Sequence, residues 1–351
     1  MVTAAPVFRS YAPMPVLPPV KKFVSQSGVR IYRIPCQVLP TLSARVYLLL
    51  GAGPPTLVDT GSGLGASTRH ILAGLETIRR EFGEPLHAGD IGRIIISHGH
   101  LDHIGGLPDL LQLAAAEVAI HPLDRAAVTS HREYALGSDR LNDFLLQAGV
   151  DPARREALMN SSRQIGKRIE GTEIGLALAA GQELEGLRVI HTPGHSPGHV
   201  CLGVGNVLLS ADHILAQTIS QQWPQSTAPY AGLGHYLASL EKIERMPGFT
   251  LTLAAHEQVI HNVYERITTI RAAIVRRLER LLDLLGTASR PLSVDEIARQ
   301  SYPEVTGFRA VLAITDVGAR VEYLHQQGRL TAAPLDDAGH GQNPVERYRV
   351  T

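Results

Sequence analysis

Four potential metal ligands lie within six consecutive positions of this chain, directly after a run of three isoleucines at residues 94–96. The ligands are His98, His100, Asp102 and His103. A hydrophobic core does not require such a cluster, whereas neutral imidazole and carboxylate groups are good zinc donors. Alternation along an extended loop directs His98 and His100 to one side. The glycines at positions 99, 105 and 106 allow a tight turn. The segment therefore predicts a loop folded around metal ions, with Asp102 and His103 facing a second position.

The charge balance and the cysteine content limit the classes of protein to which the chain can belong. Lysine plus arginine equal aspartate plus glutamate at 33 each, so no global field draws the protein toward nucleic acid or an anionic membrane. The two cysteines, Cys36 and Cys201, are too few for a disulfide framework and are predicted to be small buried residues. Residues 1–24 lack the pattern of a signal peptide, and no long apolar stretch predicts a membrane span. We expect a cytoplasmic protein with no membrane partner.

The order of predicted elements divides the chain into three parts. Residues 1–28 form a proline-rich N-terminal extension. Residues 29–264 form the main domain, in which short β-type runs alternate with amphipathic helices. A polar helical insertion at about 122–174 interrupts this pattern and is expected to overhang the metals and supply a substrate pocket. Residues 265–351 predict a short helix from Ser293 to 297, a longer one over 309–327 and two short terminal segments. With the preceding helix, they have the pattern of a small winged-helix domain.

The spacing His-x-His-x-Asp-His after a buried strand resembles the signature of the metallo-β-lactamase superfamily. The resemblance implies an α/β (α+β) fold, a four-layer αββα sandwich with the site at one edge of its two sheets. It also implies further ligands downstream. The segment at residues 192–199 is similar to the family's second motif, in which His195 completes the first metal site with His98 and His100. In that segment His199 is a spare histidine, expected to cap the chain or to lie in the core.

Three more residues are assigned by the same resemblance. Asp212, which closes a predicted strand, is similar in position to the aspartate that bridges both metals. His256, which follows the last predicted strand, is the expected final ligand, with His261 as its competitor. The second metal would then be bound by Asp102, His103, His256 and Asp212. Asp59 at the end of an early strand is expected to accept hydrogen bonds that orient a ligand or the loop.

Two metal ions held about 3.5–4 Å apart can share a water molecule, lower its pKa and present hydroxide to an electrophile. Asp102 would orient that hydroxide or accept its proton, which makes Asp102 the predicted catalytic residue. Zinc is the first choice for this donor set, with manganese or iron as alternatives. An aspartate at position 212 differs from the thiolate of the best-known β-lactamase class. It is similar instead to glyoxalase-type thioesterases, lactonases and tRNA-processing nucleases of the superfamily.

We therefore predict a dinuclear hydrolase of a small-molecule ester, thioester or lactone. One alternative is an RNA phosphodiesterase, because the appended winged helix is similar to that of lactamase-like relatives that include a mitochondrial endoribonuclease. The arginines at 271, 276, 277 and 280 cluster at helical spacing but give only a weak basic footprint. A structural or dimerising role for the wing domain is therefore favoured, which is compatible with a homo-oligomer. The other alternative is an iron persulfide dioxygenase. Trp223, Tyr230 and His235 are candidate pocket walls.

Overall fold

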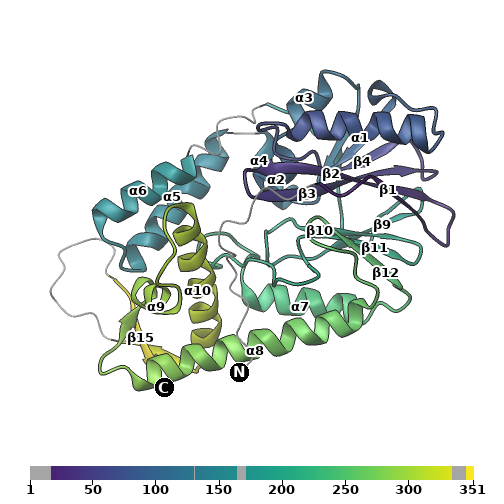
Figure 1. Ribbon diagram of the computed structural model, residues 1–351. Helices are drawn as coiled ribbons and strands as arrows, with labels where there is room; N and C mark the ends of the chain where they lie inside the picture. Colours follow the sequence, from purple (N-terminus) through teal and green to yellow (C-terminus); the bar gives the residue numbers. More distant parts are fainter. Residues whose placement is uncertain (1–16, 130, 164–170, 334–344) are drawn as a thin grey trace.

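The structure is a computed structural model that describes residues 17–129, 131–163, 171–333 and 345–351. Two β-sheets lie face to face at its centre, and helices cover their outer faces (Figure 1). The first sheet has seven strands in the order β1-β2-β3-β4-β5-β6-β7. Their bounds are Lys21–Val24, Arg30–Leu39, Leu42–Leu50, Thr56–Val58, Arg93–Ile95, Glu117–Ile120 and Leu176–Ala177. Strands β1 to β4 pair antiparallel, and β4 to β7 pair parallel.

The second sheet has five strands in the order β12-β11-β10-β9-β8. From β8 to β12 their bounds are Glu183–Leu184, Leu187–His191, Val200–Val204, Val207–Ala211 and Leu251–Ala254. Pairing is antiparallel except between β11 and β12, which run parallel. Because β5, β11 and β12 all deliver their carboxyl ends to one edge, the residues that follow them can meet there.

Apolar side chains from both sheets fill the space between them, including Ile31 and Leu49 from the first and Leu202 and Leu209 from the second. Outside the first sheet lie α1 (Ser67–Glu81), the short α2 (Leu101–Ile104) and α3 (Leu107–Leu111), and η1 (Ala88–Asp90) lies nearby in the chain. Outside the second sheet lie α7 (Leu233–Glu244) and the first half of α8 (Val263–Thr287). The layers therefore run helix, sheet, sheet, helix, and the mixed α/β class predicted from the sequence is confirmed.

The first sheet begins earlier than the sequence suggests. Strand β1 pairs with β2 from Lys21↔Arg33 to Val24↔Arg30, so residues assigned to the N-terminal extension belong to the sheet. The boundary at residue 29 was placed too late, because four half-exposed residues without strict apolar alternation give a weak strand pattern. What precedes residue 17 lies outside the described residues.

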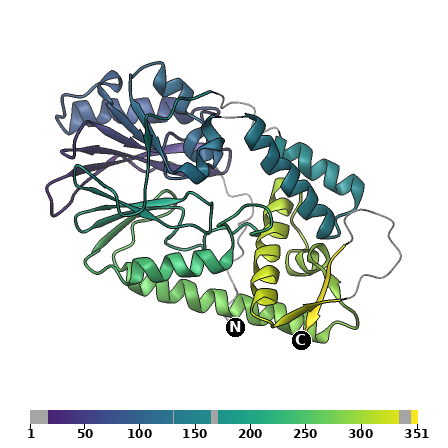
Figure 2. The same ribbon diagram turned by 180° about the vertical axis from the view of Figure 1, so that it is seen from behind.

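The predicted insertion consists of η2 (Pro122–Asp124), α4 (Ala126–Thr129), α5 (His131–Gln147) and α6 (Pro152–Arg163). The two long helices do not stand alone over the site. Phe144 and Leu145 of α5 and Leu158 of α6 share a hydrophobic core with the C-terminal part of the chain. Figure 2 shows the α5–α6 pair beside that part from behind. The insertion and the C-terminal part therefore form one packing unit.

That C-terminal part contains the end of α8, α9 (Val294–Ser301), α10 (Phe308–Gln326) and a three-stranded sheet. The sheet has the order β13-β15-β14, with bounds Leu292–Ser293, Arg347–Val350 and Leu330–Ala332. Helix α9 starts where the sequence predicts because Ser293 and Glu296 form a capping box. It extends to Ser301, beyond the predicted end. Among the helices that the structure describes, none combines the length and the apolar character needed to cross a membrane.

Candidate metal centre

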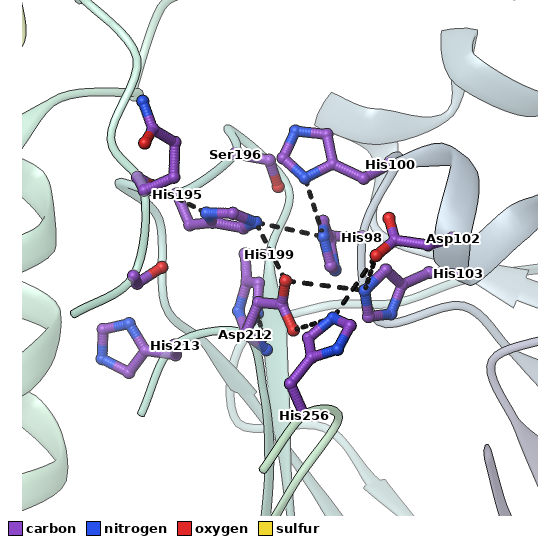
Figure 3. Close-up of polar contacts among 12 residues, drawn as sticks. His98, His100, Asp102, His103, His195, Ser196, His199, Asp212, His213 and His256 are labelled. Atoms are coloured by element: carbon purple, nitrogen blue, oxygen red, sulfur yellow. Dashed lines mark hydrogen bonds and ion pairs between the residues drawn. The ribbon is translucent and has the colours of Figure 1, made fainter. Parts of the chain in front are cut away.

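The seven predicted ligands converge at one edge of the two sheets (Figure 3). His98 and His100 follow β5, and Asp102 and His103 lie on the short helix α2 directly after them. The other three come from the second sheet and are His195 in the β9–β10 loop, Asp212 after β11 and His256 after β12. The backbone N–H of Val200 donates to the carbonyl of Ser97 at 2.9 Å and so joins the two sheets beside the cluster. Residues up to 158 positions apart in the sequence thus become neighbours.

The first group of potential ligands consists of three histidines. His98 Nε2 lies 3.0 Å from His100 Nδ1 and 3.2 Å from His195 Nε2. Burial lowers the pKa of His98 well below its ordinary value and that of His195 to about 4, so both rings are neutral at pH 7. Because these rings are neutral, each has an unprotonated nitrogen, and the three nitrogens can direct their lone pairs to one point. This is the donor arrangement that a divalent cation requires.

The second group consists of Asp102, His103 and His256, whose ligand atoms lie within 4.8 Å of one another. His256 Nε2 is 3.3 Å from Asp102 Oδ2. Burial by itself would lower the pKa of His256, but the Asp212 and Asp102 carboxylates outweigh it and raise the pKa to about 9. Without a metal ion, the two carboxylates attract a proton to this ring. A bound cation would supply the same positive charge in its place.

Asp212 lies between the two groups. Its Oδ2 is 3.6 Å from both His195 Nε2 and His103 Nε2, and its Oδ1 is 3.4 Å from His256 Nε2. Among the described residues, His103 Nε2 and Asp212 Oδ1 are buried atoms without a hydrogen-bond partner. Such atoms are costly unless something else satisfies them. The seven residues therefore fit a pair of divalent cations in donor type and orientation.

A second set of contacts fixes the rings from behind. Asp59 accepts hydrogen bonds from the Ser97 N–H and hydroxyl, each at 2.8 Å, and its Oδ2 lies 2.8 Å from His103 Nδ1. His256 Nδ1 is 2.8 Å from the Ser43 carbonyl, and His195 Nδ1 is 2.7 Å from the Gln221 carbonyl. A carbonyl accepts only from a protonated nitrogen, so both rings carry a proton on Nδ1, and each ring in its neutral form presents its Nε2 lone pair to the site.

The structure separates the competing histidines. His256 lies in the cluster, whereas His261 is exposed on the chain before α8. His199 is fully buried, and its Nδ1 lies 2.8 Å from Thr192 Oγ1. The Asp212 N–H donates to His199 Nε2 at 3.3 Å. His199 therefore supports the backbone that carries Asp212, as a spare core histidine rather than a member of either group.

The three proposed pocket walls are placed differently. The ring centroids of Trp223 and His100 are 6.5 Å apart, so Trp223 stands beside the first group. Tyr230 is exposed and pairs with His235 at 5.7 Å between ring centroids. Neither Tyr230 nor His235 belongs to a potential ligand group in the part of the chain that the structure describes.

Asp124 is a residue of the site that the sequence analysis missed. Its buried carboxylate accepts hydrogen bonds from the Gly99 N–H at 2.9 Å, the Gly198 N–H at 2.6 Å and the Ser196 hydroxyl at 2.6 Å. Gly99 lies between His98 and His100, and Ser196 directly follows His195. Asp124 thereby ties together the two loops that supply the first group. In the sequence it is an ordinary aspartate in a turn, and no spacing rule connects it to either loop.

Comparisons with known proteins match the region of the chain that carries the site. The family model described as the Metallo-beta-lactamase superfamily matches residues 39–256, a span that includes all seven candidate ligands. Probable metallo-hydrolase YqjP of Bacillus subtilis is 24% identical, covering 82% of this chain and 89% of that protein. Atrochrysone carboxyl ACP thioesterase AacuM of Aspergillus aculeatus is also 24% identical, covering 75% of this chain and 72% of that protein.

A solved structure shows the same architecture over most of the chain. The crystal structure of a metallo-beta-lactamase family protein from Thermus thermophilus is 26% identical to it, with a TM-score of 0.74. The similarity covers 92% of this chain and 98% of that one. At this coverage the shared arrangement extends beyond the matched span 39–256 into the C-terminal part.

Proposed function

The chain belongs to the metallo-beta-lactamase superfamily, and on that premise we propose that it is a dinuclear metal-dependent hydrolase of a small-molecule ester, thioester or lactone. The observation that carries the proposal is the position of Asp212 between two complete ligand groups. In this assignment His98, His100 and His195 hold one ion, and Asp102, His103 and His256 hold the other. Asp212 serves both ions. Zinc suits this mixture of imidazole and carboxylate donors, and manganese or iron are the alternatives.

A bound pair of divalent cations supplies Lewis-acid stabilisation and makes water a nucleophile at neutral pH. The protein's part is to hold and orient the reacting groups. Burial opposes ionisation of Asp102, but His103 and His256 hold its pKa well below the usual range. Asp102 is therefore a carboxylate at pH 7, and we assign it the orientation of the attacking water or the acceptance of its proton. The hydrogen bonds from the rings to the Ser43, Gln221 and Asp59 acceptors keep the rings in fixed positions throughout.

The names of the relatives and the aspartate at position 212 both support a carbonyl compound as the substrate. The relative from Aspergillus aculeatus is named an atrochrysone carboxyl ACP thioesterase, and this chain has an aspartate and not a cysteine at position 212. Trp223 beside His100 would form an apolar wall for such a substrate. Thioesters are therefore the substrate class to examine first.

We also propose that the C-terminal part is a winged-helix domain with a structural role. Helices α8, α9 and α10 with the small sheet have the required order of elements. The arginines of α8 do not form one exposed face, since Arg276 and Arg280 are exposed while Arg271 and Arg277 are partly covered. Nucleic-acid binding through this helix is accordingly the less favoured role.

The test is a hydrolysis screen of the zinc-loaded full chain over thioesters, esters, lactones, β-lactams, phosphodiesters and RNA, with His100→Ala as the control. We expect turnover of at least one carbonyl substrate that is lost in His100→Ala and after chelation. Cleavage confined to RNA, with an affinity that falls steeply with salt, would replace the proposal with the phosphodiesterase function. Turnover that survives His100→Ala would refute the assigned site.

A further inference from the structure

One loop connects helix α10 of the C-terminal part to the metal centre by contacting both. Residues 221–226, here named the anchor loop, lie between Asp212 and α7 in the sequence. Helix α10 stands between the α5–α6 pair and the sandwich in both ribbon views (Figures 1 and 2). The anchor loop carries the carbonyl that faces His195 and also carries Trp223, which stands beside His100. Its position therefore bears directly on the first ligand group.

Both ends of the anchor loop are hydrogen-bonded to α10. At one end the Gln221 side-chain amide donates to the Leu312 carbonyl at 2.9 Å and to Thr315 Oγ1 at 3.3 Å. At the other end the Gln225 N–H donates to the Glu322 carboxylate at 2.7 Å, and the Ser226 hydroxyl donates to the same group. Gln221 thus receives a hydrogen bond from His195 on its backbone and gives two to α10 from its side chain.

Close packing supports the same contact. Trp223 packs against the core that α10 shares with α5 and α6. A methyl group on Gly318 of α10 would come within 2.4 Å of Phe144 and 3.1 Å of Pro224 in the anchor loop. Only a glycine at this position lets α10 approach both neighbours at once. The loop is therefore held by polar contacts at its ends and by apolar contacts in its middle.

We propose that α10 positions His195 through the anchor loop, so that the C-terminal part completes the metal centre instead of serving as an appended binding module. Gln221 and Glu322 are the positioning residues. The Gln221 carbonyl selects the His195 tautomer whose Nε2 is free, and α10 fixes that carbonyl in space. This inference rests on the proposed function, because it concerns the same pair of metal ions.

The experiment measures zinc affinity of the full chain by competition with a chromophoric chelator. Gln221→Met keeps the length of the side chain and removes its donor, so we expect the affinity for the ion held by His195 to fall by about 10-fold, as for other groups that orient a ligand. Glu322→Ala should weaken zinc binding in the same direction. Glu322→Gln, which can still accept from the Gln225 N–H, should restore most of the affinity. Glu304→Ala replaces an exposed glutamate of the same part and should bind zinc as the unmodified chain does.

A cobalt-substituted sample adds a readout that a loss of stability alone would not change. The d–d absorption of the cobalt ion should shift in Gln221→Met at a temperature where circular dichroism shows the folded protein. Unchanged zinc affinity and unchanged cobalt spectra in Gln221→Met and Glu322→Ala would overturn the inference while leaving the hydrolase proposal intact. Failure of the unmodified chain to bind zinc, manganese or iron would instead refute the proposed function itself.

Discussion

The carboxylate of Asp124 accepts a hydrogen bond from the Ser196 hydroxyl at 2.6 Å, although the two residues are 72 positions apart. The same carboxylate receives the backbone N–H groups of Gly99 and Gly198. One buried charge thus holds the loop of His98 and His100 against the loop of His195. The distance between His195 and the pair His98 and His100 therefore depends on Asp124, which belongs to neither potential ligand group.

Asp124→Ala should lower the free energy of unfolding by about 2–3 kcal/mol, because it leaves buried donors without their charged acceptor. Urea unfolding of the metal-free protein would measure this loss. Asp139→Ala, which changes an exposed aspartate of α5, should stay within about 0.5 kcal/mol of the unmodified chain. Equal stability of the Asp124 and Asp139 variants would show that the three hydrogen bonds contribute nothing net.

His256→Ala should reduce the bound zinc from two ions toward one, because His256 belongs to the second ligand group. His261→Ala should keep both ions, since that side chain is exposed. Native mass spectrometry after dialysis against a low zinc concentration distinguishes the two results. The reverse outcome, with loss of an ion only in His261→Ala, would contradict the assignment of the last ligand.

Asp59→Asn should weaken the binding of the second ion by about 10- to 100-fold, because the carboxylate that faces His103 Nδ1 is lost. The backbone at Asp59 has a φ of +64°, which asparagine also adopts readily, so the substitution does not strain the turn. Isothermal titration with zinc provides the affinity of each ion. If both affinities match those of the unmodified chain, Asp59 has no part in orienting His103.

Glu296→Gln should destabilise the C-terminal part by about 1 kcal/mol at pH 7, because glutamine keeps the capping box but loses the ion pairs with Arg290 and Arg347. Hydrogen bonding from Arg290, followed by the Ser293 N–H and the charge of Arg347, lowers the pKa of Glu296 to about 2. A group whose folded-state pKa is depressed contributes stability above its unfolded-state pKa of about 4.3 and loses it as the pH falls toward 2. The difference between the two proteins in thermal unfolding should therefore shrink between pH 4 and pH 2. A difference that is constant over this range would exclude the charge of Glu296 as its cause.

Much of the candidate site could be predicted because its first four ligands are local. His98, His100, Asp102 and His103 follow one strand within six positions, and their spacing alone indicates a metal site. His195, Asp212 and His256 could be assigned only through resemblance to a family, because nothing in the chain marks them as partners of the first four. The resemblance also favoured His256 over His261, and in the structure His256 follows β12 and lies in the cluster.

The residues that were missed act over long separations in the sequence. Gln221 bonds to Leu312 and Thr315, more than 90 positions away, and Glu322 bonds to Gln225 from a similar distance. Likewise the periodicity of α5 and α6 predicts helices but does not say which apolar surface they cover. Only the tertiary structure shows that α5 and α6 pack on α10 and do not form a separate layer over the metal centre.

The sequence by itself determined the chemistry of the first four donors and the alternation of short strands with amphipathic helices, because ligand type and apolar periodicity are local properties of the chain. The tertiary structure decided which distant side chains hold those donors in place. Hydrogen bonds such as those of Asp124 and Gln221 join segments that are distant in the sequence. The packing of the whole core decides which of these segments lie side by side.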